Sequence, residues 1–324
     1  MQIGADILTG TRVLVTGVAG FIGSHLADRL VGQGSEVVGL DNFSNGFKEN
    51  LSALVKNKRF TLIKGDILNL SDVKKALKDA DVIFHMAAQS SVPKSTENPV
   101  RDFRINVQGT LNVLDGARKA DVKKVVFASS STVYGEASVL PTHEDCPLLP
   151  ISNYGAGKAA AEVYCSSYSS LYKMKIASLR YYNIFGPRAR KGVMFDLLQK
   201  LQKNSKKLEV LGTGGQAKDY LYIDDAIAAT LLVAGEGKRS GEAYNVGFGE
   251  SYDVKQLLAK MFKVLGLAGK TKPFYTGFSW HGDVQKTQAD ITKIKKLGFK
   301  PKVRFDEGLK KFVEWYKSEY GAVK

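Results

Sequence analysis

Six short runs of mainly apolar, often β-branched residues recur through the first 180 residues of this chain. Their almost continuous apolar character is typical of strands buried on both faces of a parallel sheet. Longer segments of mixed apolar and polar character separate the runs, so the sequence predicts right-handed βαβ units in a doubly wound α/β sheet. The expected strands are residues 12–16, 36–40, 59–65, 81–86, 123–129 and 175–180. The expected helices lie at about residues 21–33, 71–79, 100–119 and 155–172.

The pattern changes after about residue 180, where the elements become shorter and richer in Gly and Lys. We therefore predict a first domain over residues 1–180 and a smaller C-terminal α+β substrate domain over residues 181–324. Some of its segments, such as 219–235, are expected to pack back on the first domain. In doubly wound folds ligands bind at the carboxyl ends of the strands, so the second domain should cover that edge.

The composition is that of a soluble globular protein: of 324 residues, 44% are apolar and 24% are charged. No apolar run reaches the roughly 18 residues of a membrane span, and the N-terminus lacks the pattern of a signal peptide. Cys146 and Cys165 have no metal-ligand spacing and are expected to be free thiols in a reducing compartment. We therefore expect a cytoplasmic protein with no membrane partner and no metal.

The net charge of +15 is high and has two interpretations. It could serve an acidic partner, namely nucleic acid, a membrane surface or a phosphorylated small molecule, or it could be a solvated basic surface. The lysines are scattered, with modest clusters at 200–207 and 293–296, and no nucleic-acid-binding motif accompanies them. A solvated surface is therefore favoured, and no nucleic-acid partner is expected.

A glycine-rich turn follows the first expected strand, in the stretch TGVAGFIGSHLADRL. Gly17 permits a tight turn, Gly20 lets a pyrophosphate approach the backbone, and Gly23 lets helix and strand pack closely. The helix N-terminus then offers N–H groups and a partial positive charge to an anion. Because the pattern lies between a strand and a helix at the start of the βαβ series, it predicts a Rossmann-type dinucleotide-binding fold rather than a purely structural turn.

Residues after the next strands indicate which dinucleotide is bound. Asp41 follows the second strand, where a carboxylate can accept both ribose hydroxyls and would repel a 2′-phosphate, so NAD is favoured over NADP. The alternative is an aspartate that only stabilises a turn. Asp66, after the third strand, and Ala87 and Ala88, after the fourth, are expected near the adenine half of the cofactor.

Tyr154 and Lys158 lie four residues apart in the Ala-rich segment SNYGAGKAAAE and would share one face of a helix. A phenol is a poor base at its ordinary pKa of about 10. An ammonium about 4 Å away would favour the phenolate by about 4 kcal/mol, or about three pKa units. The pair could then take a proton from a substrate hydroxyl beside a hydride acceptor. The alternative is a structural tyrosine and a surface lysine, because Y-x-x-x-K is common by chance.

The fifth strand ends in FASSSTVYG, which places hydroxyl groups at its carboxyl tip. Such hydroxyls could orient a substrate hydroxyl and stabilise charge that develops on it, whereas the alternative is a Ser-rich turn without function. The candidates are Ser129, Ser130, Ser131 and Thr132.

With these residues the chain resembles extended short-chain dehydrogenases/reductases of the NAD-dependent epimerase/dehydratase family, and within it the nucleotide-sugar 4-epimerases. The resemblance extends over about residues 11–315. It implies that the first domain binds NAD and that the second binds a nucleotide sugar. Further motifs that carry it are HMAAQSSV (85–92), PVRDFRINVQGTLNVL (99–114), RYYNIFGP (180–187), LGTGGQAKDYLYIDD (211–225), YNVG (244–247) and GDVQKTQADITKIKKLGFKP (282–301).

The resemblance also implies roles for individual residues. Tyr154 would be the base, Lys158 its activator and a ribose ligand, and Ser130 the catalytic serine, with Ser131 as a second candidate and Thr132 in support. The other implied cofactor contacts are Phe21, Ile22, Asn42, Ile67, Gln89 and Asn106. The implied substrate contacts are Ser130, Asn183, Val193, Lys218 and Thr287.

Relatives that dehydrate or decarboxylate the sugar carry an acidic residue just before the VYG triplet, where this chain has Ser131 and Thr132. Neither side chain is a general base at neutral pH. The resemblance therefore implies NAD-dependent epimerisation at C4 of a nucleotide-diphosphate sugar through a 4-keto intermediate. The expected substrates are UDP-glucose and UDP-galactose or the N-acetylhexosamine pair, for which Thr287 would leave room. The alternatives are a dehydrogenase or reductase of the same family, or a non-enzymic RNA-binding relative.

Two expected phosphate contacts differ from the arginines that are usual in the family. Lys218 replaces one, and it keeps the charge without the bidentate fork, while Trp280 and His281 stand where the other is expected. The cations that could compensate are Arg188, Arg190 and Lys191.

The expected helices 100–119 and 155–172 should lie side by side on one face of the sheet. Relatives dimerise through a four-helix bundle of two such helices from each subunit, so the resemblance implies a homodimer. The second helix carries small residues suited to close approach, which are Ala156, Ala159, Ala160 and Ser167.

Overall fold

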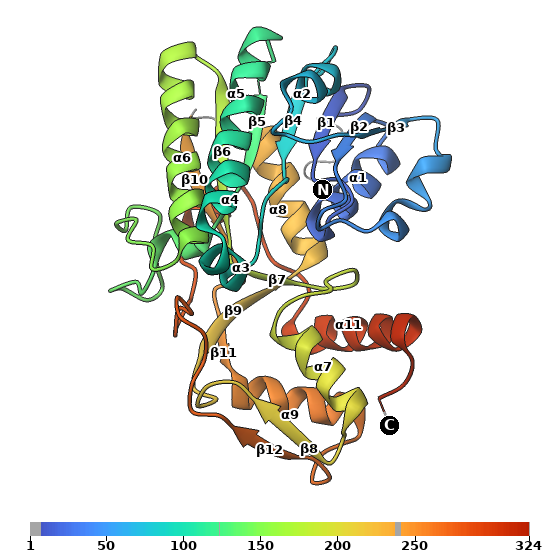
Figure 1. The fold of residues 1–324 in the computed structure, drawn as a ribbon, viewed down its shortest axis with the longest axis vertical. Coiled ribbons are helices and arrows are strands. Elements are labelled where there is room, and N and C mark those ends of the chain that lie inside the picture. The colour runs from blue at the N-terminus through green and yellow to red at the C-terminus, as the bar shows by residue number, and fades with distance from the viewer. Residues whose placement is uncertain (1–7, 123, 237–240, 324) are drawn as a thin grey trace.

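The computed structural model describes residues 8–122, 124–236 and 241–323, and its largest element is a seven-stranded sheet (Figure 1). The strand order is β10-β6-β5-β4-β1-β2-β3, and every neighbouring pair is parallel. The predicted doubly wound α/β fold is therefore confirmed, although β10 comes from the second half of the chain and was not predicted. The strands are β1 (Arg12–Thr16), β2 (Glu36–Asp41), β3 (Phe60–Lys64), β4 (Val82–His85), β5 (Lys124–Ser130), β6 (Lys175–Tyr181) and β10 (Glu242–Val246).

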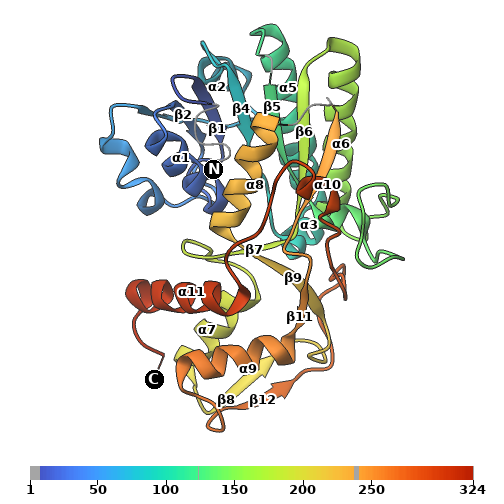
Figure 2. The same ribbon diagram turned by 180° about the vertical axis from the view of Figure 1, so that it is seen from behind.

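Helices cover both faces of this sheet, with α1 and α8 on one face and α2, α5 and α6 on the other (Figures 1 and 2). Successive residues of a strand therefore meet different cores: Val13 and Val15 belong to one buried cluster, and Leu14 belongs to the other. This two-sided burial explains why the strands are almost continuously apolar. The helices are α1 (Phe21–Gly32), α2 (Leu70–Ala76), α5 (Gly109–Lys119), α6 (Asn153–Tyr172) and α8 (Ile223–Glu236).

Local signals account for the ends of α6. The helix begins two residues before the expected position, because the Ser152 side chain accepts a hydrogen bond from the N–H of Gly155. It ends at Tyr172, after which Lys173 adopts a left-handed conformation with φ = 57°. The expected helix 100–119 is not uniform: a π-helical turn separates its first part from α5. Between β4 and α5 the chain forms α3 (Val92–Glu97), α4 (Pro99–Phe103) and the π-helical turn Arg104–Gln108.

A smaller group of elements lies beyond the carboxyl ends of the strands of the large sheet (Figure 1). β9 pairs with β7 and β11 in one small sheet, and β8 pairs with β12 in another. The strands are β7 (Asn183–Phe185), β8 (Lys207–Val210), β9 (Ala217–Tyr222), β11 (Ser251–Asp253) and β12 (Lys272–Tyr275). The helices are α7 (Val193–Lys203), α9 (Val254–Leu265), α10 (Thr292–Lys295) and α11 (Phe305–Tyr320).

The division of the chain at residue 180 stays a prediction. α8 and β10 follow that position in the chain, yet α8 packs on β5 and β6, and β10 forms one edge of the large sheet. Residues 1–7 and 123 of the predicted first domain, and 237–240 and 324 of the second, lie outside the described residues. Within the described parts of the chain, no helix combines the length and apolar character needed to cross a membrane.

Candidate active site

The glycine-rich turn between β1 and α1 forms a cradle of backbone atoms. Gly17 has φ = +67°, and a Cβ atom there would lie 2.7 Å from the backbone of Ala87. A Cβ atom at Gly23 would lie 2.2 Å from the carbonyl oxygen of Gly17, so neither position accepts a larger residue without movement. Gly20 is the N-cap of α1, and no side chain caps this helix end. The cradle therefore suits the pyrophosphate of a dinucleotide.

Asp41, at the end of β2, faces this turn. Its two carboxylate oxygens accept hydrogen bonds from the N–H groups of Ala19 (2.8 Å) and Phe43 (2.7 Å), and burial raises its pKa. Each oxygen can accept a further hydrogen bond, so the carboxylate can stabilise the turn and also bind ribose hydroxyls. Both roles considered for this residue are therefore compatible. Beside it, Asn42 Nδ2 donates to Asp66 Oδ2 at 2.8 Å.

A cleft of about 430 Å³ includes this cradle and the N-terminal end of α6. Most of the residues proposed for the cofactor line it, whereas the residues proposed for the substrate mostly do not. The proposed residues in its wall are Gly17, Gly20, Phe21, Ile22, Gly23, Asp41, Asn42, Asp66, Ile67, Ala87, Ala88, Ser130, Tyr154 and Lys158. The proposed residues outside its wall are Gln89, Asn106, Thr132, Asn183, Val193, Lys218 and Thr287.

Several residues in the wall of the cleft were not named from the sequence. Tyr181 at the end of β6, Tyr182 after it and Ile184 of β7 line it, and the RYYNIFGP motif could have indicated them. The loop Ser44–Phe47 also lines it, and nothing in its sequence distinguishes it from an ordinary surface loop.

Tyr154 and Lys158 project into the cleft from the first turns of α6. Lys158 is buried, and its ammonium donates to the carbonyl oxygen of Ala128 at 2.7 Å and lies 4.8 Å from the ring centroid of Phe127. Burial lowers the pKa of Lys158 to about 8. The side chain is therefore still mostly charged at neutral pH, and strand β5 holds it in place.

The expectation that Lys158 brings the pKa of Tyr154 close to neutrality is wrong for the protein without cofactor. Burial raises the pKa of the Tyr154 phenol to about 12, although a hydrogen bond with Ser130 acts in the opposite direction. Asp102 raises the pKa further. The physical reason is that the phenolate would lose solvation, while the ammonium of Lys158 is directed at Ala128. A further cation near the phenol, such as an oxidised nicotinamide, would favour its ionisation.

The hydroxyl groups at the tip of β5 have different surroundings. Ser130 Oγ accepts hydrogen bonds from the Thr132 N–H (3.2 Å) and the Thr132 hydroxyl (3.0 Å), and Ser130 lines the cleft. Ser129 also lines the cleft, but its hydroxyl donates to Glu162 at 2.7 Å. Ser131 does not line the cleft. The geometry thus favours Ser130 over Ser131 as the serine that meets a substrate.

Gln89 and Asn106 form a buried support behind the cleft. The side-chain oxygen of Asn106 accepts from the Gln89 N–H (3.1 Å), and its amide donates to the Gln89 carbonyl (3.0 Å). Both side-chain amides also donate to one oxygen of Asp102, at 2.8 and 3.0 Å. Sequence reasoning missed Asp102, although its place four residues before Asn106 on a helix could have indicated it. The three residues join the segment after β4 to the π-helical turn.

The residues proposed for the substrate diphosphate have other partners. The ammonium of Lys218 lies 3.0 Å from a carboxylate oxygen of Asp283 and also donates to the Val284 carbonyl. Trp280 and His281 are exposed and do not line the cleft.

The remaining residues proposed for the substrate, Thr287, Asn183 and Val193, do not line the cleft. Thr287 is buried, and its hydroxyl accepts from the Asp219 N–H at 3.3 Å. Asn183 is exposed at the start of β7, and Val193 opens α7.

The loop before α7 brings cations to the cleft, because Arg188, Arg190 and Lys191 all line it. Arg188 pairs with Asp28 of α1 at 2.7 Å, and Arg190 donates to the Asn50 side chain at 2.7 Å. Burial lowers the pKa of Lys191, which is expected for a cation in a cleft without a bound anion.

The fold and the cleft together define a dinucleotide-dependent enzyme with a tyrosine and a lysine on the helix after the fifth strand. A sequence model of the NAD dependent epimerase/dehydratase family matches residues 13–247. The chain belongs to this family, and its cofactor is NAD. The glycine cradle and the Asp41 carboxylate fit that cofactor.

Similar proteins are named as epimerases, which are isomerases. A UDP-glucose 4-epimerase from Mycolicibacterium smegmatis is 36% identical over 95% of this chain and 99% of that protein. The structure of a UDP-glucose 4-epimerase with UDP-glucose from Thermotoga maritima has 35% identity and a TM-score of 0.88, covering 95% of this chain and 99% of that one. A UDP-N-acetylglucosamine 4-epimerase from Methanobrevibacter ruminantium, in complex with UDP-N-acetylmuramic acid, has 33% identity and a TM-score of 0.89, covering 96% and 99%.

Proposed function

We propose that this enzyme interconverts the C4 epimers of a nucleotide-diphosphate sugar, with UDP-glucose and UDP-galactose as the first pair. The observation that carries the proposal is that Tyr154, Lys158 and Ser130 meet in the same cleft as the glycine cradle. Ser131 and Thr132 stand where an acidic residue would serve dehydration. A site with one proton-transfer group and one hydride acceptor can oxidise an alcohol and reduce it again. The activities for which the relatives are named support this assignment.

The residues of the cleft have different roles in the proposed reaction. NAD, when bound, supplies a hydride acceptor that is regenerated when the hydride returns. Tyr154 takes the proton of the sugar 4-hydroxyl and later gives it back, and Ser130 donates a hydrogen bond to the same oxygen as its charge changes. Lys158 keeps a positive charge in the cleft, held in place by the Ala128 carbonyl.

The diphosphate of the substrate needs cations that are not already paired with carboxylates. Lys218 is held by Asp283, so its charge is largely compensated. Lys191 lines the cleft, and its ammonium lies 3.4 Å from the neutral side-chain oxygen of Asn45. We therefore assign the main phosphate contact to Lys191 rather than to Lys218 or to Arg188, which is likewise paired with a carboxylate, that of Asp28.

Conversion of UDP-galactose into UDP-glucose by the purified protein, without added reductant, tests the proposed function. Anion-exchange chromatography of the nucleotides should show both sugars approaching the same ratio from either direction. Net formation of NADH with a single sugar would instead assign a dehydrogenase. Retention of RNA at physiological salt, without turnover of any sugar nucleotide, would favour the RNA-binding alternative.

The choice between plain and N-acetylated sugars is proposed to depend on Thr287. A small side chain there leaves room for an N-acetyl group, so both pairs are expected as substrates. Thr287→Tyr should lower kcat/KM for UDP-N-acetylgalactosamine at least tenfold more than for UDP-galactose, whereas Thr287→Val should lower both equally. Equal losses for both sugars in the tyrosine variant would contradict this role.

We also propose that the protein forms a homodimer. α4 and α6 are neighbours on one face of the sheet and expose large apolar side chains to solvent. Gathered on neighbouring helices, such side chains are typical of an interface. They are Val100, Phe103, Val163 and Tyr164.

A further inference from the structure

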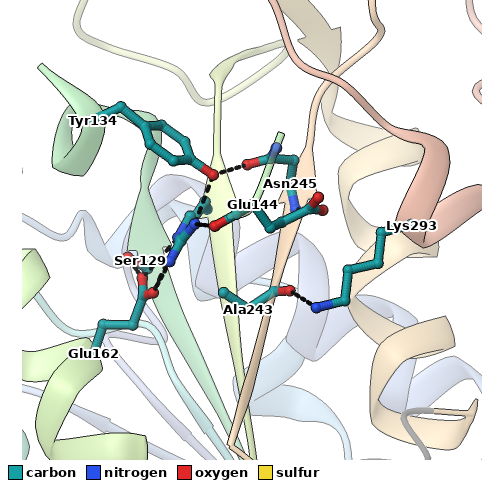
Figure 3. Close-up of polar contacts among 8 residues, drawn as sticks. Ser129, Tyr134, Glu144, Glu162, Ala243, Asn245 and Lys293 are labelled. Atoms are coloured by element: carbon teal, nitrogen blue, oxygen red, sulfur yellow. Dashed lines mark hydrogen bonds and ion pairs between the residues drawn. The ribbon is translucent and has the colours of Figure 1, made fainter. Parts of the chain in front are cut away.

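A buried ion pair joins Glu162 of α6 to Arg180 of β6, and Glu162 is one of the residues drawn in Figure 3. Glu162 of α6 stands one helical turn after Lys158, and its carboxylate accepts from Arg180 Nε at 3.0 and 3.2 Å. The same carboxylate accepts from the Ser129 hydroxyl at 2.7 Å. The Arg180 and Glu162 side chains are only 7% and 9% exposed. One carboxylate thus connects α6 with the tip of β5 and with the end of β6.

The network continues from Arg180 towards β10. Arg180 Nη1 donates to the Tyr134 hydroxyl and to the Glu144 carbonyl oxygen, both at 2.7 Å. The Tyr134 hydroxyl in turn donates to Asn245 Oδ1 at 2.8 Å. Tyr134 belongs to the turn that follows Ser130, and Asn245 belongs to β10 (Figure 3). Arg180 therefore connects the turn Ser131–Tyr134, which follows Ser130, to the edge strand β10 through the Tyr134 hydroxyl.

Asn245 then contacts the segment 286–290, which contains the proposed sugar-binding residue Thr287. Its side-chain amide donates to the carbonyl oxygens of Thr142 (2.9 Å) and Asp290 (3.2 Å). Thr142 also pairs through its backbone with this segment: its N–H donates to the Gln288 carbonyl at 2.8 Å, and its carbonyl accepts from the Asp290 N–H at 2.9 Å. Thr287 adjoins Gln288 in this segment, so a continuous series of hydrogen bonds, partly buried at its Asp290 end, runs from α6 to the residue next to Thr287.

We propose that Glu162, Arg180 and Tyr134 are positioning residues that hold the catalytic groups in register with the segment 286–290. This inference rests on the proposed epimerase function. Glu162 and Arg180 keep Ser130 of β5 and Tyr154 of α6 at a constant separation. Through its hydrogen bond with Asn245, Tyr134 fixes the position of the segment 286–290 relative to these two catalytic residues. Such a network is suited to a reaction in which one proton-transfer group must serve both faces of the same sugar carbon.

The test must separate positioning from folding, because removing one partner of a buried pair leaves an uncompensated charge. The double variant Glu162→Gln/Arg180→Met removes both charges together and should therefore fold better than Glu162→Gln alone. We expect the double variant to retain bound NAD and a cooperative melting transition. Its kcat for UDP-galactose should nevertheless fall at least tenfold.

Tyr134→Phe addresses the second half of the network, since it removes only the hydroxyl that joins Arg180 to Asn245. We expect KM for UDP-galactose to rise at least threefold, with kcat within twofold of wild type. The control is Arg12→Met/Glu36→Gln, which removes a largely exposed ion pair at the opposite, amino-terminal edge of the sheet. It should leave both kcat and KM unchanged.

The outcomes are distinct. If the folded, NAD-loaded double variant keeps more than half of the wild-type kcat, the positioning role is overturned and the ion pair is structural. Unchanged KM in Tyr134→Phe overturns the link to the sugar-binding segment. If the wild-type protein itself does not interconvert the sugars, the proposed function fails first, whatever the variants do.

Discussion

At the scale of single residues, the chemistry depends on Tyr154, whose pKa burial raises to about 12 in the absence of cofactor. Tyr154→Phe should lower the kcat of epimerisation by roughly 10²–10⁴, since this is the range a positioned proton-transfer group supplies. Bound NAD and the melting temperature should stay close to wild type. Steady-state rates measure kcat, chromatography of the released nucleotide measures bound NAD, and thermal unfolding measures the melting temperature. The exposed Tyr164 of the same helix provides the control Tyr164→Phe, which should be fully active.

Lys158 should make stability depend on pH. Burial lowers its pKa from 10.5 to about 8, so the unfolded chain binds the proton more tightly, and the free energy of unfolding rises between about pH 8 and pH 10.5. Lys158→Met removes this dependence. The NAD-free variant should be more stable than wild type at pH 7 by up to about 3 kcal/mol, less the cost of leaving the Ala128 carbonyl unpaired.

Urea unfolding of both NAD-free proteins at pH 7 and pH 10 measures this difference. The advantage of Lys158→Met should shrink as the pH approaches 10.5, because the wild-type lysine is then neutral in the folded protein and increasingly neutral in the unfolded chain. If the difference in free energy of unfolding between the two proteins is the same at both pH values, burial of the charged Lys158 does not destabilise the folded protein. The variant should also be nearly inactive, as expected where a functional group is kept at the expense of stability.

At the scale of elements, the contact between β1 and α1 decides whether the cofactor can bind. A Cβ atom at Gly23 would lie 2.2 Å from the Gly17 carbonyl, so Gly23→Ala should push the helix away from the turn. We expect NAD content to fall at least tenfold, together with the melting temperature. Gly32, at the other end of α1, meets nothing within 4 Å. Gly32→Ala should therefore keep NAD and gain up to about 1 kcal/mol of stability.

At the scale of the whole molecule, the exposed apolar side chains of α4 and α6 should be covered by a second copy of the chain. Val163→Glu/Tyr164→Glu would place two charges in that interface, and light scattering should then report a monomer where the wild type is a dimer. Phe274→Glu, at an exposed position on β12, is the control and should stay dimeric. A monomeric wild type would contradict the proposed interface.

The strands of the large sheet differ in how far the sequence predicted them. Six were predicted because each is a recognisable, mainly apolar run, which two-sided burial explains for five of them, whereas β3 at the sheet edge is only partly buried. β10 was not, because EAYNV is short and partly polar, and its partner β6 lies far away in the chain. Its pairing is a long-range contact, and no local pattern indicates such a contact.

The sequence by itself determined the glycine cradle, the strand tip with its hydroxyls, and the Tyr154–Lys158 spacing, because each depends on residues that are close together in the chain. Only the tertiary structure decided that Tyr154 stays neutral without cofactor, that Asp283 compensates Lys218, and that the Glu162–Arg180 pair joins three elements. Solvation and charge pairing depend on which groups meet in space, and that is set by the packing of elements remote in sequence.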